Sequence, residues 1–263
     1  MTAPTAPAAP AAAPATAVVL TCNGQQHLER TLASLDFCQR LLVVDSGSTD
    51  ATLDIARAAG ADILTRAWEG TIPQFRFAFE QVDTPWIVTL DQDEFLSPEL
   101  KASLRAALAD PAGATGFFCP RRSWYLDRFI RHSGWYPDLL LRAFRLDAVE
   151  IRGTLPHEEF HPTGPVRTLS GDIVHYPYAD LAEHLDKINR YTTAAAAELH
   201  RQGRPSGLAR ALGHGAGKFA KQYLLKQGFR DGRAGLVLAV HAFLYAFHKY
   251  MKLDELNRRA GHK

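Results

Sequence analysis

The 263-residue chain is 46% hydrophobic and 22% charged, with a formal net charge of +2. This composition excludes a chain that is disordered throughout and allows a substantial core. The cysteines Cys22, Cys38 and Cys119 lie far apart without metal-type spacing, which favours ordinary buried thiols in a reducing compartment. The charge is uneven, because residues 1–199 hold 17 Lys and Arg against 25 Asp and Glu, whereas residues 200–263 hold 13 against 3.

The first sixteen residues differ from the rest of the chain. After the initiator methionine they are only Ala, Pro and Thr. Ala-Pro repeats neither pack nor complete a helix, so we expect residues 1–16 to be a disordered leader. The stretch lacks the basic start and long apolar centre of a signal peptide.

Short apolar runs then alternate with helical patterns. The runs that predict buried strands are residues 17–20, 41–44, 61–64 and 86–90. The helices predicted between them cover residues 28–35, 49–59 and 74–81. Asn23 is expected to cap the first helix, Ser48 to cap the second and Gly60 to end it. Strands that are apolar on both faces and alternate with helices indicate an α/β fold with a parallel sheet covered on both sides.

Polar residues follow three of these predicted strands: Thr21 and Asn23, Asp45 and Ser46, and Asp91 and Asp93. Ligands of open parallel α/β sheets bind at the carboxyl ends of the strands, so we expect the three pairs to converge on one sheet edge. The Asp-x-Asp pair is suited to holding Mg²⁺ or Mn²⁺ against a phosphate, because one or two carboxylates often suffice for these ions. The plainer alternative is a solvated acidic turn after a strand.

The motifs in this order resemble the family 2 glycosyltransferases of GT-A fold. The segments that carry the resemblance are residues 18–23, 43–52 and 90–94. Later segments, residues 131–138, 142–145, 156–158 and 186–191, resemble the bacterial branch that adds sugars to the lipopolysaccharide inner core. The resemblance spans residues 17–255. One departure is Gln74-Phe75-Arg76, where the branch usually carries a Gln-Lys-Asn-like run, so the cation is displaced by one place.

The resemblance implies a site for a nucleotide-sugar donor, with a UDP-sugar favoured. The implied donor-binding residues are Thr21, Asn23, Asp45, Ser46, Arg76 and Asp91. Asp45 would contact the base and Asp91 the ribose, while Asp93 would hold Mg²⁺ or Mn²⁺, with His157 as a further metal ligand. The cation offsets the negative charge that grows on the leaving diphosphate.

The implied reaction is an inverting transfer of a sugar to a hydroxyl of a lipid-linked saccharide, and it needs a general base. Asp138 is the first candidate, because Trp135, Tyr136 and the leucines after it can partly desolvate the carboxylate and raise its pKa. Glu158 is the second candidate. An exposed turn aspartate after Pro137 is the structural alternative for Asp138.

The resemblance and the composition together imply two regions after the leader. Residues 17–199 form the catalytic domain, with a donor half at 17–110 and an acceptor half at 111–199. Residues 200–263 form a helical extension that associates with an anionic membrane surface. Its apolar run, residues 234–247, is shorter than the roughly 20 residues that span a bilayer. We expect it in the membrane interface, with a core helix as the alternative.

The tail does not favour nucleic acid, because its charges flank an apolar helix instead of alternating with stacking aromatics. Together with this tail, the resemblance to enzymes whose acceptors are membrane lipids implies a peripheral protein on the cytoplasmic face of the bacterial inner membrane.

Three other functions stay open at this point. A sugar-1-phosphate nucleotidyltransferase would carry a Gly-rich loop and a Lys after the first strand, where this chain offers only Gly24. The run from His157 to His161 matches the His-Glu-x-x-His pattern of zinc proteases, but Pro156 and Pro162 disfavour the helix that this pattern requires. A membrane-bound scaffold without turnover is the non-enzymatic possibility.

Overall fold

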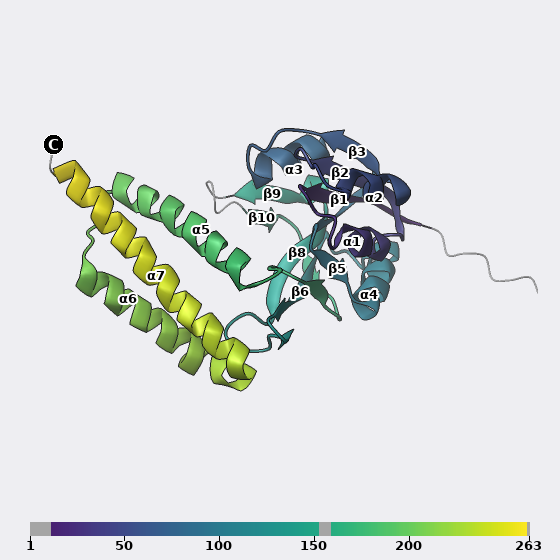
Figure 1. Cartoon of the computed structure of the whole chain (residues 1–263). Helices are drawn as coiled ribbons and strands as arrows, with labels where there is room; N and C mark the ends of the chain where they lie inside the picture. The colour runs from purple at the N-terminus through teal and green to yellow at the C-terminus, as the bar shows by residue number, and fades with distance from the viewer. Residues whose placement is uncertain (1–11, 153–158, 262–263) are drawn as a thin grey trace, which may run out of the picture. The chain divides into compact units, whose positions relative to one another are not determined.

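The computed structural model describes residues 12–152 and 159–261, which form two compact units (Figure 1). Among the described residues, the sheet unit comprises residues 12–121, 139–152 and 159–174. The helical unit comprises Arg122–Asp138 and the chain from His175 onward. The predicted α/β fold with a helical C-terminal extension is confirmed.

The main sheet runs in the order β3-β2-β1-β4-β8-β6-β12-β5, with β7 and β11 also pairing with β6. Its strands are β1 (Ala13–Thr21), β2 (Cys38–Asp45), β3 (Asp62–Thr65), β4 (Trp86–Asp91), β5 (Glu94–Leu96), β6 (Gly116–Tyr125), β7 (Arg128–Phe129), β8 (Asp138–Arg145), β11 (Val166–Thr168) and β12 (Ile173–His175). β1, β2, β3 and β4 pair with one another in parallel, as predicted, whereas β8 runs antiparallel to β4. β9 (Val149–Arg152) and β10 (Glu159–Pro162) form a separate antiparallel pair.

Two apolar clusters cover the two faces of this sheet. The helices of the sheet unit are α1 (Leu28–Ser34), α2 (Thr52–Ala58), α3 (Thr71–Phe79), α4 (Pro98–Ala109) and the 3₁₀ turn η1 (Leu146–Ala148). One cluster joins α1, α2 and α4 to the strands, through Leu28, Leu32 and Leu100. The other joins α3 to the opposite face, where Phe75 and Phe79 contact Phe160 of β10. The burial of apolar side chains on both faces explains why these strands are apolar throughout.

The first strand begins earlier than expected. Ala13, Ala15 and Thr16 are buried in β1, so residues 13–16 belong to the sheet and not to a leader. The pairing of β1 with β2 is irregular between Ala13 and Thr16, and this irregularity accommodates Pro14, which has no N–H to donate. Residues 1–11, the rest of the predicted leader, lie outside the described residues.

The helical unit contains α5 (Leu181–Arg201), α6 (Leu208–Ala220), a π-helical turn η2 (Lys221–Leu225), a 3₁₀ turn η3 (Gly228–Asp231) and α7 (Gly232–Gly261). α7 packs against both α5 and α6, and the buried face of α7 includes Leu238 and Ala239 from the apolar run 234–247. Much of that run therefore forms the core of this unit. Across the described stretches, every helix is too short or too polar to span a bilayer.

The boundary between the units differs from the predicted boundary at residue 199. α5 belongs with α7, because its buried residues Ile188 and Ala196 face the helical core. The segment Arg122–Asp138 also joins the helical unit, through Tyr125 and Ile130. A shift in charge composition marks where basic residues accumulate and does not reveal which helices share a core. Among the cysteines, Cys38 and Cys119 are buried as expected, but Cys22 is exposed.

Candidate functional site

Three neighbouring strands end together at one edge of the sheet. β1 lies between β2 and β4, and in the register of these strands Thr21 pairs with Asp45, while Leu20 pairs with Asp91. The loops after the three strands therefore start side by side. This is the edge at which the sequence predicts a ligand site.

The loops after β1 and β2 are joined by hydrogen bonds. The backbone N–H of Asn23 donates to the Ser48 hydroxyl at 2.8 Å, and the Asn23 side-chain oxygen accepts from the Thr49 N–H at 2.9 Å. Asp45 is buried and accepts from the N–H groups of Gly47 and Ser48, at 2.9 and 3.0 Å, and from the Ser48 hydroxyl. Asn23 and Ser48 thus hold two loops together and do not cap helices, which corrects the expectation for both residues.

Gln92, between the two aspartates, fastens their turn to the end of β1. Its side-chain oxygen accepts from the Thr21 hydroxyl at 2.7 Å and from the Cys22 N–H at 2.9 Å. Its carbonyl accepts from the Thr31 hydroxyl at 3.0 Å. A Cβ atom on Gly24 would lie 2.5 Å from the Gln92 side-chain oxygen, so any larger residue here would force the Gln92 or Thr21 side chain to move. The Asp-x-Asp turn is therefore held in place by the residue between its carboxylates.

A buried ion-pair network lies behind Asp91. Glu94 is fully buried and accepts from Arg142 at 2.6 Å, from Arg121 at 2.8 Å and from the backbone N–H of Asp91 at 3.1 Å. Arg142 also donates to the Asp91 carboxylate at 2.8 Å. Burial lowers the pKa of Arg142, but Asp91 and Glu94 outweigh this effect and hold it above its ordinary value. The guanidinium is therefore a permanent cation that orients Asp91.

The carboxylates of this turn suit a divalent cation bound together with phosphate. The Asp91 side chain is 46% exposed and Asp93 is half-buried, so ligands from solvent can reach both. Arg142 already compensates the charge of Asp91, which makes the Asp91 carboxylate less available to a metal ion. Within the described residues no group of three or more His, Cys, Asp or Glu could hold a metal. A bound Mg²⁺ or Mn²⁺ would then need phosphate and water oxygens as well.

Comparison with known proteins decides the family, because the model of glycosyl transferase family 2 matches residues 16–174, which contain all of this edge. The chain belongs to glycosyl transferase family 2. It is a glycosyltransferase of GT-A fold, with a parallel-rich sheet flanked by helices.

Similar proteins include other bacterial glycosyltransferases. The lipopolysaccharide core biosynthesis glycosyltransferase LpsC of Rhizobium meliloti is 27% identical over 247 residues, which cover 89% of each chain. An uncharacterised glycosyltransferase of Rickettsia typhi is 23% identical and covers 90% of this chain and 85% of its own. Among solved structures, glucosyl-3-phosphoglycerate synthase of Mycobacterium tuberculosis with Mn²⁺, UDP and phosphoglyceric acid aligns with a TM-score of 0.46 and 17% identity, covering 74% of this chain and 80% of that one.

Two of the predicted donor-binding residues, Ser46 and Arg76, differ in whether they contact the buried side of α3 in this glycosyltransferase. The buried Gln74 donates to the Ser46 hydroxyl at 2.9 Å and to the Arg66 carbonyl at 3.0 Å. Arg76 is two residues further along α3 and lies about 200° around the helix from Gln74. Arg76 is exposed there. Gln74 therefore contacts Ser46, one of the predicted donor-binding residues, whereas Arg76 faces away from Ser46.

Of the residues predicted for the acceptor side, the structure describes Asp138. Asp138 is half-buried, begins β8 and belongs to the helical unit. Glu158 and His157 lie outside the described residues. His161 lies in β10, which pairs with β9, and the zinc-protease pattern would require a helix there. Together with the family, this finding removes the protease and nucleotidyltransferase alternatives.

Glu94, Arg142, Gln92 and Gln74 are not among the site residues that the sequence predicts. A usable signal existed for Arg142, because one charged residue within the apolar run 139–144 implies a buried partner. The partner itself lies 48 residues earlier in the chain, and only the insertion of β8 beside β4 brings the two together.

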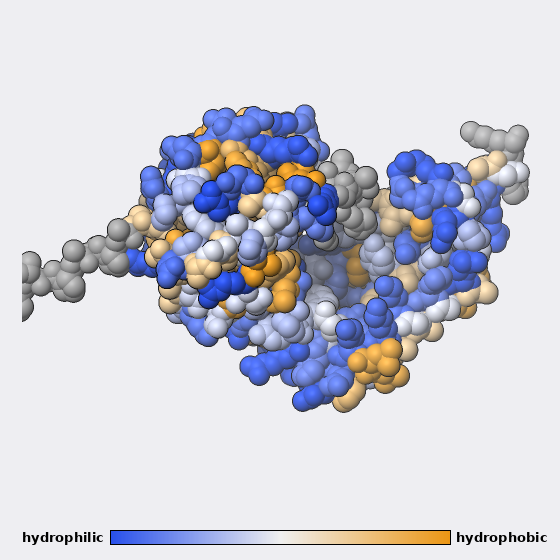
Figure 2. All heavy atoms as spheres, turned by 180° about the vertical axis from the view of Figure 1, so that it is seen from behind, coloured by the Kyte–Doolittle hydropathy of each residue, from blue (hydrophilic) through white to orange (hydrophobic). Residues whose placement is uncertain are grey.

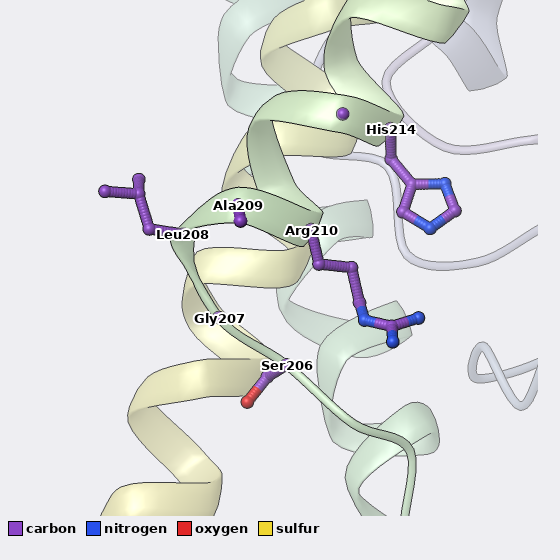
Figure 3. A pocket seen from close by; sticks show the side chains of 7 residues that line it. Ser206, Gly207, Leu208, Ala209, Arg210 and His214 are labelled. Carbon is purple, nitrogen blue, oxygen red and sulfur yellow. The ribbon is translucent and has the colours of Figure 1, made fainter.

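A separate depression of about 650 Å³ lies at the start of α6 and is lined by seven residues between Ser206 and His214. Arg210 and His214 project to one side of the helix there and Leu208 to the other (Figure 3). None of the described residues predicted for donor or metal binding lines it. It consists of consecutive residues around one helix N-terminus, so we assign it no role.

Proposed function

We propose that the enzyme is an inverting, metal-dependent glycosyltransferase that uses a nucleoside diphosphate sugar, with a UDP-sugar as the first candidate. The observation that carries this proposal is the Asp91-Gln92-Asp93 turn, which is held at the joint ends of β1, β2 and β4 by the contacts of Gln92 and by the Arg142–Glu94 pair. Such a preorganised carboxylate pair suits a diphosphate and its cation.

In the donor half, Asp45 and Thr21 would contact the base, Asn23 and Ser46 would shape the same wall, and Asp91 would bind the ribose. These loops share hydrogen bonds, so the donor would meet a preformed wall. Asp93 would hold Mg²⁺ or Mn²⁺, and His157 stays a proposed further ligand. The bound cation would offset charge on the departing diphosphate. Arg76 is the least supported member of the donor set, because it is exposed on the far side of α3 from Gln74.

In the acceptor half, the acceptor hydroxyl would attack the anomeric carbon as the bond to the diphosphate oxygen breaks. Its proton would pass to a carboxylate, for which Asp138 is the first candidate and Glu158 the second. Asp138 follows a loop whose backbone is fixed by Asp231, with hydrogen bonds of 3.1 and 2.9 Å to the N–H groups of Arg131 and His132. A base that directly follows a fixed loop can be positioned for one in-line displacement, which inverts the anomeric configuration.

The acceptor would be a saccharide carried on a lipid, and lipopolysaccharide core is the first candidate. The name of the Rhizobium meliloti relative, a lipopolysaccharide core biosynthesis glycosyltransferase, supports this acceptor class, since the similarity extends over 89% of both chains. The enzyme would then work at the cytoplasmic face of the bacterial inner membrane, as a peripheral protein on anionic lipid. No role with nucleic acid is proposed.

The test is a thermal-shift screen of nucleotide sugars with and without Mn²⁺, followed by transfer assays with the donor that binds. A ligand that binds only the folded state raises the midpoint of unfolding with its concentration. We expect one nucleotide class to stabilise the protein, more strongly with Mn²⁺. NMR of the product would give its anomeric configuration, and retention of configuration would contradict the inverting step.

A further inference from the structure

The helical unit has an unusual end, where α6 passes through η2 and η3 into α7. We call residues 221–231 the helical tip. Leu225 is 78% exposed, Leu224 58% and Phe229 51%. Single exposed apolar residues are ordinary, but three large ones within six residues form a concentrated apolar surface. In Figure 2 the lower edge of the helical unit shows a compact hydrophobic patch directly beside hydrophilic atoms.

The charges of the helical tip are one-sided. Lys221, Lys226 and Arg230 are exposed. The single acidic residue, Asp231, is 4% exposed and is engaged by the loop Arg131–Ser133. The outer surface of the tip is therefore apolar and cationic. An anionic lipid surface matches both properties, because basic residues gain about 1 kcal/mol each near it and apolar side chains enter the headgroup boundary.

The helical tip is also attached to the loop that leads to Asp138. The Ser133 N–H donates to the Lys226 carbonyl at 2.8 Å, and the Ser133 hydroxyl donates to Asp231 at 3.1 Å. His132 contacts the same carboxylate through its ring nitrogen at 3.1 Å. Gly134 has a φ of 74° and lies against the side chain of Lys226. The helical tip thus has an apolar and cationic outer surface, and its inner side holds the 131–134 loop.

We propose, resting on the proposed lipid-linked acceptor, that the helical tip inserts into anionic bilayers and thereby brings the 131–134 loop to the lipid surface. The membrane-contacting element is then the tip and not the apolar run of α7, whose buried face packs against α5 and α6. A lipid-linked saccharide would emerge from the bilayer next to the loop that leads to the proposed base. The proposed partner is a lipid surface with net negative charge. The experiment below also distinguishes it from a protein partner.

The experiment is co-sedimentation of the full chain with vesicles of phosphatidylglycerol and phosphatidylethanolamine, compared with vesicles of phosphatidylcholine. We expect binding to the anionic vesicles that weakens as salt is raised. The variant Leu224→Ser/Leu225→Ser/Phe229→Ser and, independently, the variant Lys221→Glu/Lys226→Glu/Arg230→Glu should each bind about tenfold more weakly or less. All six side chains are exposed, so both variants should keep the unfolding midpoint of the wild type.

The matched control is Leu208→Ser/Leu212→Ser, which removes two exposed leucines from α6 of the same unit. It should bind like the wild type. Equal vesicle binding by the wild type and both tip variants would overturn the inference, as would absence of wild-type binding. A tip-dependent change of mass in light scattering without vesicle binding would also overturn it, and would identify an interface between protein chains.

Failure here is separable from failure of the proposed function. Donor hydrolysis, or transfer to a lipid-free saccharide, requires no membrane, so the tip variants should retain wild-type rates in those assays. Sugar transfer at the wild-type rate without vesicle binding would reject membrane insertion by the helical tip and leave the proposed reaction intact. Vesicle binding without any donor turnover would instead reject the proposed reaction.

Discussion

Arg142 and Glu94, 48 residues apart in the chain, form a buried ion pair with a hydrogen bond of 2.6 Å. Glu94 directly follows the Asp91-Gln92-Asp93 turn, and Arg142 lies on β8, beside the strand that leads into that turn. Because the same guanidinium also bonds Asp91, the pair connects the stability of the sheet unit to the geometry of the site.

Replacement of Arg142 should destabilise the fold strongly. Arg142→Met leaves the charge of Glu94 buried with Arg121 as its remaining arginine partner, which costs about 3 kcal/mol. Urea unfolding monitored by circular dichroism measures the difference. The matched control is Arg145→Met on the same strand, whose partner Asp147 is exposed, so its unfolding should change little. Equal losses of unfolding free energy for the two substitutions would mean that the buried pair contributes no more to stability than the exposed pair.

Gly24→Ala should disturb the Asp-x-Asp turn by displacing the Gln92 side chain. The new methyl group would displace the Gln92 side chain and break its hydrogen bonds to Thr21 and Cys22, at a cost of about 1–3 kcal/mol. Calorimetric titration with a nucleotide and Mn²⁺ should show weaker binding than in the wild type. Gly213→Ala, where nothing lies within 4 Å of the new atom, is the control and should bind normally. Unchanged binding by Gly24→Ala would show that Gln92 does not support the site.

Asp138→Asn should fold and still bind the donor nucleotide but lose transfer by about 10²–10⁴-fold, the usual contribution of a general base. Steady-state transfer assays and nucleotide titrations on the same preparation check both halves of this expectation. Near-normal turnover would move the role to Glu158, and Glu158→Gln is the variant to compare.

Acid should weaken the helical unit through one buried cluster. The Nδ1 atoms of His184 and His241 lie 2.8 Å apart, and the Tyr125 hydroxyl lies 2.8 and 3.2 Å from them. Burial, reinforced by His241 and Lys187, lowers the pKa of His184 from 6.5 to about 4. The unfolded chain therefore binds the proton more readily, so this group's effect on stability is absent above about pH 6.5 and becomes unfavourable as the pH falls towards 4.

The size of this acid effect is about 3 kcal/mol for His184 when fully developed. The difference in unfolding free energy between wild type and His184→Gln, followed from pH 7.5 to 4.5, isolates it from the carboxylates. His214→Gln, at an exposed position, is the control. A difference that stays constant over this range would show that His184 does not titrate differently in the folded and unfolded chains.

The sequence predicts the four parallel strands of the donor half well, because each strand is marked by the pattern of its own residues. Apolar runs bounded by polar residues locate β1, β2, β3 and β4, and Gly60, with a φ of 72°, ends α2 as expected. The predicted helix caps were wrong because Asn23 and Ser48 form hydrogen bonds between two loops that lie 25 residues apart in the chain. The antiparallel β8 and its Arg142 could not be located, since strand order depends on contacts that no local pattern encodes. The same limit hid the core that α5 shares with α7.

Asp93 is the residue on which the proposed metal-dependent donor site depends most directly. The decisive measurement is calorimetric binding of the donor nucleotide, with and without Mn²⁺, to the wild type and to Asp93→Asn. We predict that Mn²⁺ strengthens binding to the wild type by about tenfold or more, equivalent to about 1.4 kcal/mol, and that Asp93→Asn keeps the metal-free affinity but loses this gain. The same Mn²⁺ gain in both proteins would contradict the assignment of the metal to Asp93.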